Sequence, residues 1–202
     1  MENILFLLND HTFRVVAIGC SILGICYGVI GSFAFLRKQS LLGDAIAHAS
    51  LPGVCISFLL TNSKNTEVLL FGALITGIIC IWLIQLIQTY TKIKFDRILA
   101  FILSVFFGLG LVLLSYLNKL PGANKAGLNK FIFGQASTLL IRDVLVISCI
   151  SAMIIILIAV FWKEFKVLSF DPDYAEIIGV SVRGFGTFLS MLTVICIIIG
   201  IQ

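Results

Sequence analysis

The chain is poor in charge, since only 12% of its 202 residues are Asp, Glu, Lys or Arg while 60% are hydrophobic. The mean hydropathy is +1.14. So few charged side chains cannot cover the surface of a soluble domain, and the composition therefore predicts an integral membrane protein. The net charge of +4 indicates orientation in the membrane rather than binding to nucleic acid.

The sequence also lacks the short motifs of several enzyme classes. It contains no GxxxxGK[ST] phosphate loop, no HExxH and no GxSxG, and these absences argue against ATP hydrolysis by the chain itself and against a familiar intramembrane hydrolase. No two of the six cysteines form a CxxC pair, which leaves disulfides and zinc knuckles without support. We therefore expect a protein that is not an enzyme and holds no permanent cofactor.

Small residues inside the apolar stretches are interpreted as packing residues. The six cysteines are expected to behave as small hydrophobic side chains. Gly24 and Gly28 form a GxxxG motif that Gly31 extends along the same helix face, and such motifs predict close helix packing.

Six stretches are long and apolar enough to cross a membrane, and none shows the alternation of a β-strand. They are Val15–Leu36, Lys38–Leu60, Val68–Thr91, Ile98–Asn118, Val144–Trp162 and Gly184–Gln202. The predicted fold is an all-α, polytopic transmembrane bundle of about six spans, forming one domain over residues 1–202. The chain ends in the apolar run CIIIGIQ without a polar flank, so we expect it to be part of a longer protein.

Basic residues near the ends of the spans predict the orientation. With the N-terminus outside, the cytoplasmic side receives Arg37, Lys38, Lys92, Lys94, Arg97, Lys163, Lys166 and Arg183. The outer side then holds Arg14, Lys64, Lys119, Lys125, Lys130 and Arg142.

The second span carries an acid and a histidine in the segment LLGDAIAHASLPG, residues 41–53. Asp44 and His48 are four residues apart and therefore lie on one helix face. An ionisable side chain within a span is costly and usually faces a cavity or a partner. Pro52 disturbs the helix and crowds the carbonyl group of His48. A carboxylate, an imidazole and a freed carbonyl are suitable ligands for Mn²⁺, Fe²⁺ or Zn²⁺.

Three interpretations of this pair remain open from the spacing alone: metal or proton handling, a purely structural contact, and an N-cap role for Asp44. One helix offers too few ligands for a closed metal site. A two-fold homodimer would double the set to two carboxylates and two imidazoles.

A second informative segment is SFDPDYAEIIGVSVR, residues 169–183. Asp171 is a suitable N-cap, Pro172 a favoured first helical residue and Gly179 a suitable C-terminal stop. The apolar side chains between them, Tyr174, Ile177 and Ile178, have helical spacing. We expect a short amphipathic helix in a cytoplasmic loop, with its apolar face either on the membrane or docked on a soluble partner.

Three ordered motifs resemble the bacterial ABC-type metal-ion permeases, the zinc/manganese/iron importer family. They are LRKQSLLGDAIAHASLPGV at residues 36–54, FIFGQASTLLIRDVL at residues 131–145 and LSFDPDYAEIIGVSVR at residues 168–183. The resemblance covers essentially the whole chain. Members of this family continue with further spans, so the resemblance also implies a chain truncated at its C-terminus.

The resemblance implies a multi-pass permease subunit of the bacterial inner membrane that imports a divalent transition metal ion. Its implied partners are a second permease copy, a cytoplasmic ABC ATPase, an extracytoplasmic metal-binding protein and the surrounding lipid. The metal-handling positions of the family fall on Asp44 and His48. Its ATPase-coupling pattern falls on Asp171, Pro172, Tyr174, Ala175 and Gly179, to which the amphipathic spacing adds Ile177.

Two other functions stay open beside this one. The first is a secondary metal transporter or proton-coupled carrier that uses Asp44 and His48 as a relay. The second is an integral membrane enzyme with a bound metal, which the scarcity of other intramembrane carboxylates disfavours.

Overall fold

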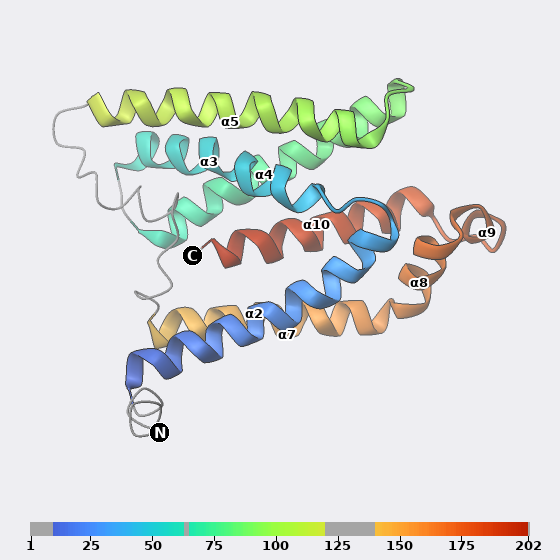
Figure 1. Cartoon of the computed structure of the whole chain (residues 1–202), viewed down its shortest axis with the longest axis horizontal. Helices are drawn as coiled ribbons and strands as arrows, with labels where there is room; N and C mark the ends of the chain where they lie inside the picture. Colours follow the sequence, from blue (N-terminus) through green and yellow to red (C-terminus); the bar gives the residue numbers. More distant parts are fainter. Residues whose placement is uncertain (1–9, 63–64, 120–139, 202) are drawn as a thin grey trace, which may run out of the picture.

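A computed structural model describes residues 10–62, 65–119 and 140–201, and within these ranges the chain is helical and contains no strand (Figure 1). The helices are α2 (His11–Leu36), α3 (Leu42–Thr61), α4 (Thr66–Tyr90), α5 (Phe95–Lys119), α7 (Ile141–Val160), α8 (Trp162–Phe170), α9 (Pro172–Ile177) and α10 (Val182–Gly200). All except α8 and α9 are long and apolar enough to cross a membrane. The six predicted spans and the all-α fold are thus confirmed, with ends that differ by a few residues.

The helices form two groups with α10 between them (Figure 1). In the first group α3 packs against both α4 and α5, and in the second α2 packs against α7 and α8. Helix α10 contacts α3 and α4 on one side and α2, α7 and α8 on the other. The sequence alone did not predict this division.

Each group has its own hydrophobic core, and α10 contributes to both. Val194 and Ile198 of α10 lie in the core of the first group. Leu189, Leu192 and Cys196, which follow a different stripe of the same helix, lie in the core of the second. Helix α3 is the most enclosed of the six spanning helices, with 61% of its apolar window buried against 17–44% for the others.

Two glycines let α3 and α4 approach closely. A Cβ atom on Gly53 would overlap the backbone of Gly72, and a Cβ atom on Gly72 would come within 2.6 Å of the carbonyl oxygen of Gly53. On the other side of α3, Leu51 packs against Gly110 of α5. The Leu-Pro-Gly sequence at residues 51–53 therefore belongs largely to helix packing.

The close packing predicted from the GxxxG motif does not occur among the described residues. A Cβ atom on Gly24, Gly28 or Gly31 would have no described atom within 4 Å. This face of α2 is exposed, because α2 buries other residues, such as Cys26, Ile30 and Phe33, in the core of the second group.

Helix α8 was not predicted from the sequence. Phe165 and Leu168 are three residues apart and both are buried, so α8 is amphipathic and packs one face into the second core. The chain leaves α7 at Phe161 and continues in a new direction as α8 (Figure 1).

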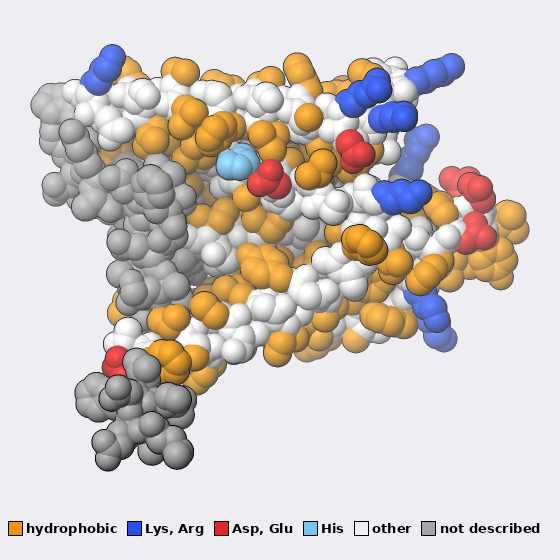
Figure 2. All heavy atoms as spheres, in the orientation of Figure 1, with side chains coloured by type: hydrophobic (Ala, Val, Ile, Leu, Met, Phe, Trp, Pro, Cys, Tyr) orange, Lys and Arg blue, Asp and Glu red, His pale blue; other side chains and the backbone are white. Residues whose placement is uncertain are grey.

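The eight basic residues assigned to the cytoplasmic side all lie in, or within a few residues of, the connections α2–α3, α4–α5 and α7–α10. These connections are at one end of the molecule, where Figure 2 shows Lys and Arg side chains gathered mainly around the α4–α5 connection. The grouping agrees with the sequence, and the orientation in the membrane stays a prediction. Of the outer set, Lys64, Lys125 and Lys130 lie outside the described residues.

Candidate functional site

Asp44 and His48 lie side by side on α3, as their spacing predicts. The Nε2 atom of His48 is 3.4 Å from Oδ1 of Asp44. Although α3 is the most enclosed spanning helix, these two side chains are 59% and 40% exposed. Figure 2 shows an acidic and a histidine side chain together on a face that is otherwise mainly hydrophobic or uncharged.

The local backbone explains the position of Asp44. Leu41 is the N-cap of α3, and Asp44 lies in the first helical turn, so the N-cap interpretation is wrong. A carboxylate in the first turn is favoured by the partial positive charge of the helix N-terminus. Pro52 is accommodated within a continuous helix that runs from Leu42 to Thr61.

Phe107 of α5 packs against the imidazole ring of His48. Its ring centre is 4.7 Å from that of His48, and the two planes meet at 67° in an edge-to-face arrangement. Such a contact limits the rotation of the imidazole and leaves its ring nitrogens free to bind. Sequence reasoning missed Phe107, because nothing distinguishes it from the other aromatic residues of an apolar span.

The separation of the two side chains suits a shared metal ion. Two ligands that each lie about 2.1 Å from Zn²⁺ in a tetrahedral arrangement are about 3.4 Å apart. The observed Nε2–Oδ1 distance of 3.4 Å therefore allows both groups to bind one ion. Among the described residues no cluster of three or more His, Cys, Asp or Glu side chains could hold a metal, so the pair supplies only half of a four-ligand site.

The predicted amphipathic helix is present as α9. The Asp171 side chain accepts a hydrogen bond from the backbone N–H of Tyr174 at 3.0 Å, and Pro172 is the first helical residue. Gly179 follows the helix with a φ of +83°, a conformation that favours glycine. These observations confirm the N-cap and the stop.

The six predicted coupling residues divide into two kinds. Tyr174 and Ile177 are 52% and 81% exposed, and with Ile178 they form an apolar face that no described residue buries. Ala175 is fully buried and anchors α9, while Asp171, Pro172 and Gly179 define where it begins and ends. The Phe-Gly segment at residues 131–139, in contrast, lies outside the described residues.

The fold and the site define a class: a multi-pass membrane protein with an accessible acid and imidazole on its most enclosed spanning helix. Residues 9–202 match the ABC 3 transport family. The chain belongs to this family of ABC-type metal-ion permeases, which confirms the resemblance described above. It is accordingly a multi-pass protein of the bacterial inner membrane.

Two curated relatives are membrane proteins of metal transport systems. The zinc transport system membrane protein TroC of Treponema pallidum is 44% identical over 202 residues, which are 100% of this chain and 68% of TroC. The manganese transport system membrane protein MntC of Bacillus subtilis is 41% identical over 201 residues, which are 100% of this chain and 46% of MntC. The chain thus spans about two thirds and about half of these two proteins.

A solved structure has the same fold. PsaBC from Streptococcus pneumoniae, determined in complex with a Fab, matches with a TM-score of 0.80 at 29% identity. The match covers 100% of this chain and 69% of the PsaBC chain. The helix arrangement described above is therefore that of a permease of this type.

Proposed function

We propose that the chain forms the membrane pathway of an ATP-driven importer for a divalent transition metal ion, Zn²⁺, Mn²⁺ or Fe²⁺. The ion is received from an extracytoplasmic binding protein and released into the cytoplasm. Asp44 and His48 bind it transiently on the way. The observation that carries this proposal is the exposed Asp44–His48 pair, whose 3.4 Å separation fits two ligands of one ion.

A second copy of the chain completes the site in this proposal. Each copy contributes a carboxylate and an imidazole, and two copies related by a two-fold axis supply four ligands. The exposure of both side chains in the single chain is what such a shared site requires. Purified protein should accordingly bind one metal ion per two chains, and one ion per single chain would contradict the shared site.

The transport test uses Asp44→Asn. This change keeps the shape of the side chain and removes the charged ligand, so uptake of radiolabelled metal should be lost while membrane insertion is retained. Asp96→Asn is the matched control, because Asp96 is also an exposed acid in the first turn of a spanning helix. Undiminished uptake by the Asp44→Asn protein would refute the site.

The energy source separates this function from a secondary or proton-coupled carrier. A reconstituted complex should hydrolyse ATP faster when metal and binding protein are added. Uptake that follows a proton gradient and needs no ATP would instead favour the carrier, with Asp44 and His48 as the relay.

Helix α9 is the proposed contact with the separate ATPase subunit. Its exposed face of Tyr174, Ile177 and Ile178 is suited to a hydrophobic groove. The neighbouring Asp173 and Glu176 are exposed and favour a groove with a basic rim over an anionic membrane surface.

Removing this face should release the ATPase. Tyr174→Ala combined with Ile177→Ala is expected to abolish co-purification of the ATPase from detergent. Tyr90→Ala combined with Ile93→Ala is the matched control, because it removes an exposed tyrosine and isoleucine, 81% and 49% exposed, at the same end of the molecule. Equal retention of the ATPase by both double variants would count against docking through α9.

A further inference from the structure

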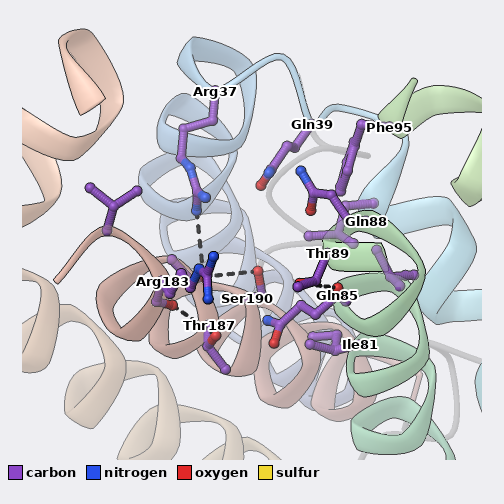
Figure 3. A pocket seen from close by; sticks show the side chains of 14 residues that line it. Arg37, Gln39, Ile81, Gln85, Gln88, Thr89, Phe95, Arg183, Thr187 and Ser190 are labelled. Atoms are coloured by element: carbon purple, nitrogen blue, oxygen red, sulfur yellow. Dashed lines mark hydrogen bonds between the residues drawn. The ribbon is translucent and has the colours of Figure 1, made fainter. Parts of the chain in front are cut away.

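A cavity of about 380 Å³, lined by polar and apolar side chains, lies at the basic end of the molecule, and neither Asp44 nor His48 is among its lining residues. It is bounded by the connection after α2, the last turns of α4 and the first turns of α10 (Figure 3). In Figure 3, Arg37, Arg183 and Ser190 lie on one side of the cavity, and Gln85 and Gln88 of α4 lie on the other. The volume is within the range of small-ligand sites.

The lining carries two positive charges and no negative one. Arg37 and Arg183 carry these charges. The other polar lining residues are all neutral, and no Asp or Glu is among the lining residues. The neutral groups are Gln39, Gln85, Gln88, Thr89, Thr187 and Ser190. The amide groups of the three glutamines can donate hydrogen bonds, whereas the hydroxyl groups of Thr89, Thr187 and Ser190 already donate to backbone carbonyl oxygens. The two guanidinium groups and the glutamine amides therefore favour an anion.

Of the lining groups, Arg37 has the strongest requirement for an anionic partner. It is half-buried, and burial lowers the pKa of its guanidinium, which nevertheless remains charged because an arginine is not deprotonated in proteins. Its hydrogen bond to the carbonyl oxygen of Gly186 is long, at 3.5 Å, and Ser190 donates to the same oxygen at 3.0 Å. No acidic side chain in the described ranges lies within 4.0 Å of Arg37.

The floor of the cavity is apolar. Leu42, Ile81, Ile84 and Phe95 line it beside the polar groups, and Leu42, Ile81 and Ile84 belong to the first hydrophobic core. The polar groups lie at the ends of α4 and α10, which are long and apolar enough to cross the membrane. The ends of spanning helices are expected where lipid headgroups meet the hydrocarbon region. A free anion would use only the arginines, whereas a phospholipid would use the apolar floor as well.

We propose that this cavity binds the phosphate of an anionic membrane lipid. The guanidinium groups of Arg37 and Arg183 hold the phosphate oxygens, a pairing that arginine favours because its donors form a planar fork. The amide groups of the glutamine side chains donate to the remaining headgroup oxygens. Basic pockets between spanning helices on the cytoplasmic side commonly bind anionic headgroups. The site is independent of the proposed transport function.

The experiment measures lipid binding to the purified protein in detergent by native mass spectrometry. Phosphatidylglycerol is compared with phosphatidylcholine and with inorganic phosphate, on wild-type protein and on Arg37→Gln/Arg183→Gln. Wild-type protein should retain phosphatidylglycerol in preference to both other probes, and the double variant should bind it at least about tenfold more weakly, because two charge-assisted contacts are lost.

Two further variants distinguish loss of a specific site from general charge attraction and from misfolding. Lys92→Gln/Lys94→Gln removes the same charge from exposed positions at the same end, and it should leave binding unchanged. Gln88→Glu adds a negative charge at an exposed position on the rim without altering the shape of the side chain. It should weaken binding even if the arginine variant fails to fold.

Several results would overturn the proposal. Equal loss in the lysine control would indicate charge attraction without a site. Equal retention of inorganic phosphate would identify a free anion as the ligand. Absence of lipid binding together with loss of the ATPase from Arg37→Gln/Arg183→Gln would assign the cavity to an acidic segment of that subunit. None of these readouts depends on metal transport, so failure here and failure of the transport proposal are separate outcomes.

Discussion

Gly53 of α3 and Gly72 of α4 face each other so closely that neither position has space for a Cβ atom. This contact joins the helix that carries Asp44 and His48 to its neighbour. Because the contact is between backbones, a side chain at either position forces the helices apart. The position of the candidate metal ligands therefore depends on a packing contact that begins five residues beyond His48.

Gly53→Ala should destabilise the protein, although alanine normally stabilises a helix relative to glycine. Overpacking typically costs about 1–3 kcal/mol, so the midpoint of thermal unfolding in detergent should fall. Gly24→Ala is the control, because a Cβ atom there meets no described atom and the change should be neutral or gain about 0.5–1 kcal/mol. A Gly53→Ala protein as stable as the Gly24→Ala protein would be inconsistent with the close approach of α3 and α4.

Phe107→Ala should weaken metal binding while the fold is retained. An edge-to-face contact contributes about 0.5–1.5 kcal/mol, which corresponds to a loss of affinity of about two- to tenfold. Isothermal titration with Zn²⁺ or Mn²⁺ measures this loss. Phe101→Ala serves as control, since Phe101 lies on the same helix and is 61% exposed. If both variants bind equally well, Phe107 has no positioning role.

Cys26 and Cys196 should be the pair of cysteines that oxidises most readily. Their sulfur atoms are 3.3 Å apart across the contact of α2 with α10, and a disulfide needs about 2.05 Å. Treatment with copper phenanthroline, followed by denaturation and maleimide labelling, should leave both thiols protected. Labelling of Cys196 should return in Cys26→Ser. Full labelling of all six cysteines after oxidation would argue against this packing of α10.

Gly179→Ala should loosen the end of α9, because a residue with a Cβ atom at a φ of +83° costs about 1–2 kcal/mol. The amides of Gly179 and Val180 donate to Glu176 and Ala175 at 3.1 and 2.9 Å, and they should exchange with solvent faster. Hydrogen exchange monitored by mass spectrometry measures the effect. Gly179→Asn is expected to exchange nearly as slowly as the wild type, because asparagine tolerates this conformation. Unchanged exchange in the alanine variant would show that the turn is not under conformational constraint.

The features that the sequence predicted are local. Apolar length is sufficient to place the spans, and a spacing of four residues is sufficient to bring Asp44 beside His48. The N-cap at Asp171 and the stop at Gly179 follow from the backbone preferences of those residue types. Each of these inferences uses residues within one or two helical turns of each other.

The features that the sequence did not predict are contacts between helices. In a membrane the lipid is as apolar as a neighbouring helix, so hydrophobic spacing does not reveal which face is packed. The glycines of α2 met the pattern for close packing and are exposed, whereas Gly53 and Gly72 met no recognised pattern and are in contact. Arg37 and Gly186 are 149 positions apart, and no local rule joins them.

The sharing of α10 between the two cores has a consequence for unfolding. Val194 and Ile198 are buried with one helix group, and Leu189 and Leu192 with the other. Unfolding of either group would expose to solvent or lipid the side chains of α10 that this group buries. The packing of α10 against the other group would then be weakened. The described helices should therefore lose their structure in a single cooperative transition, despite an architecture that looks divisible into halves.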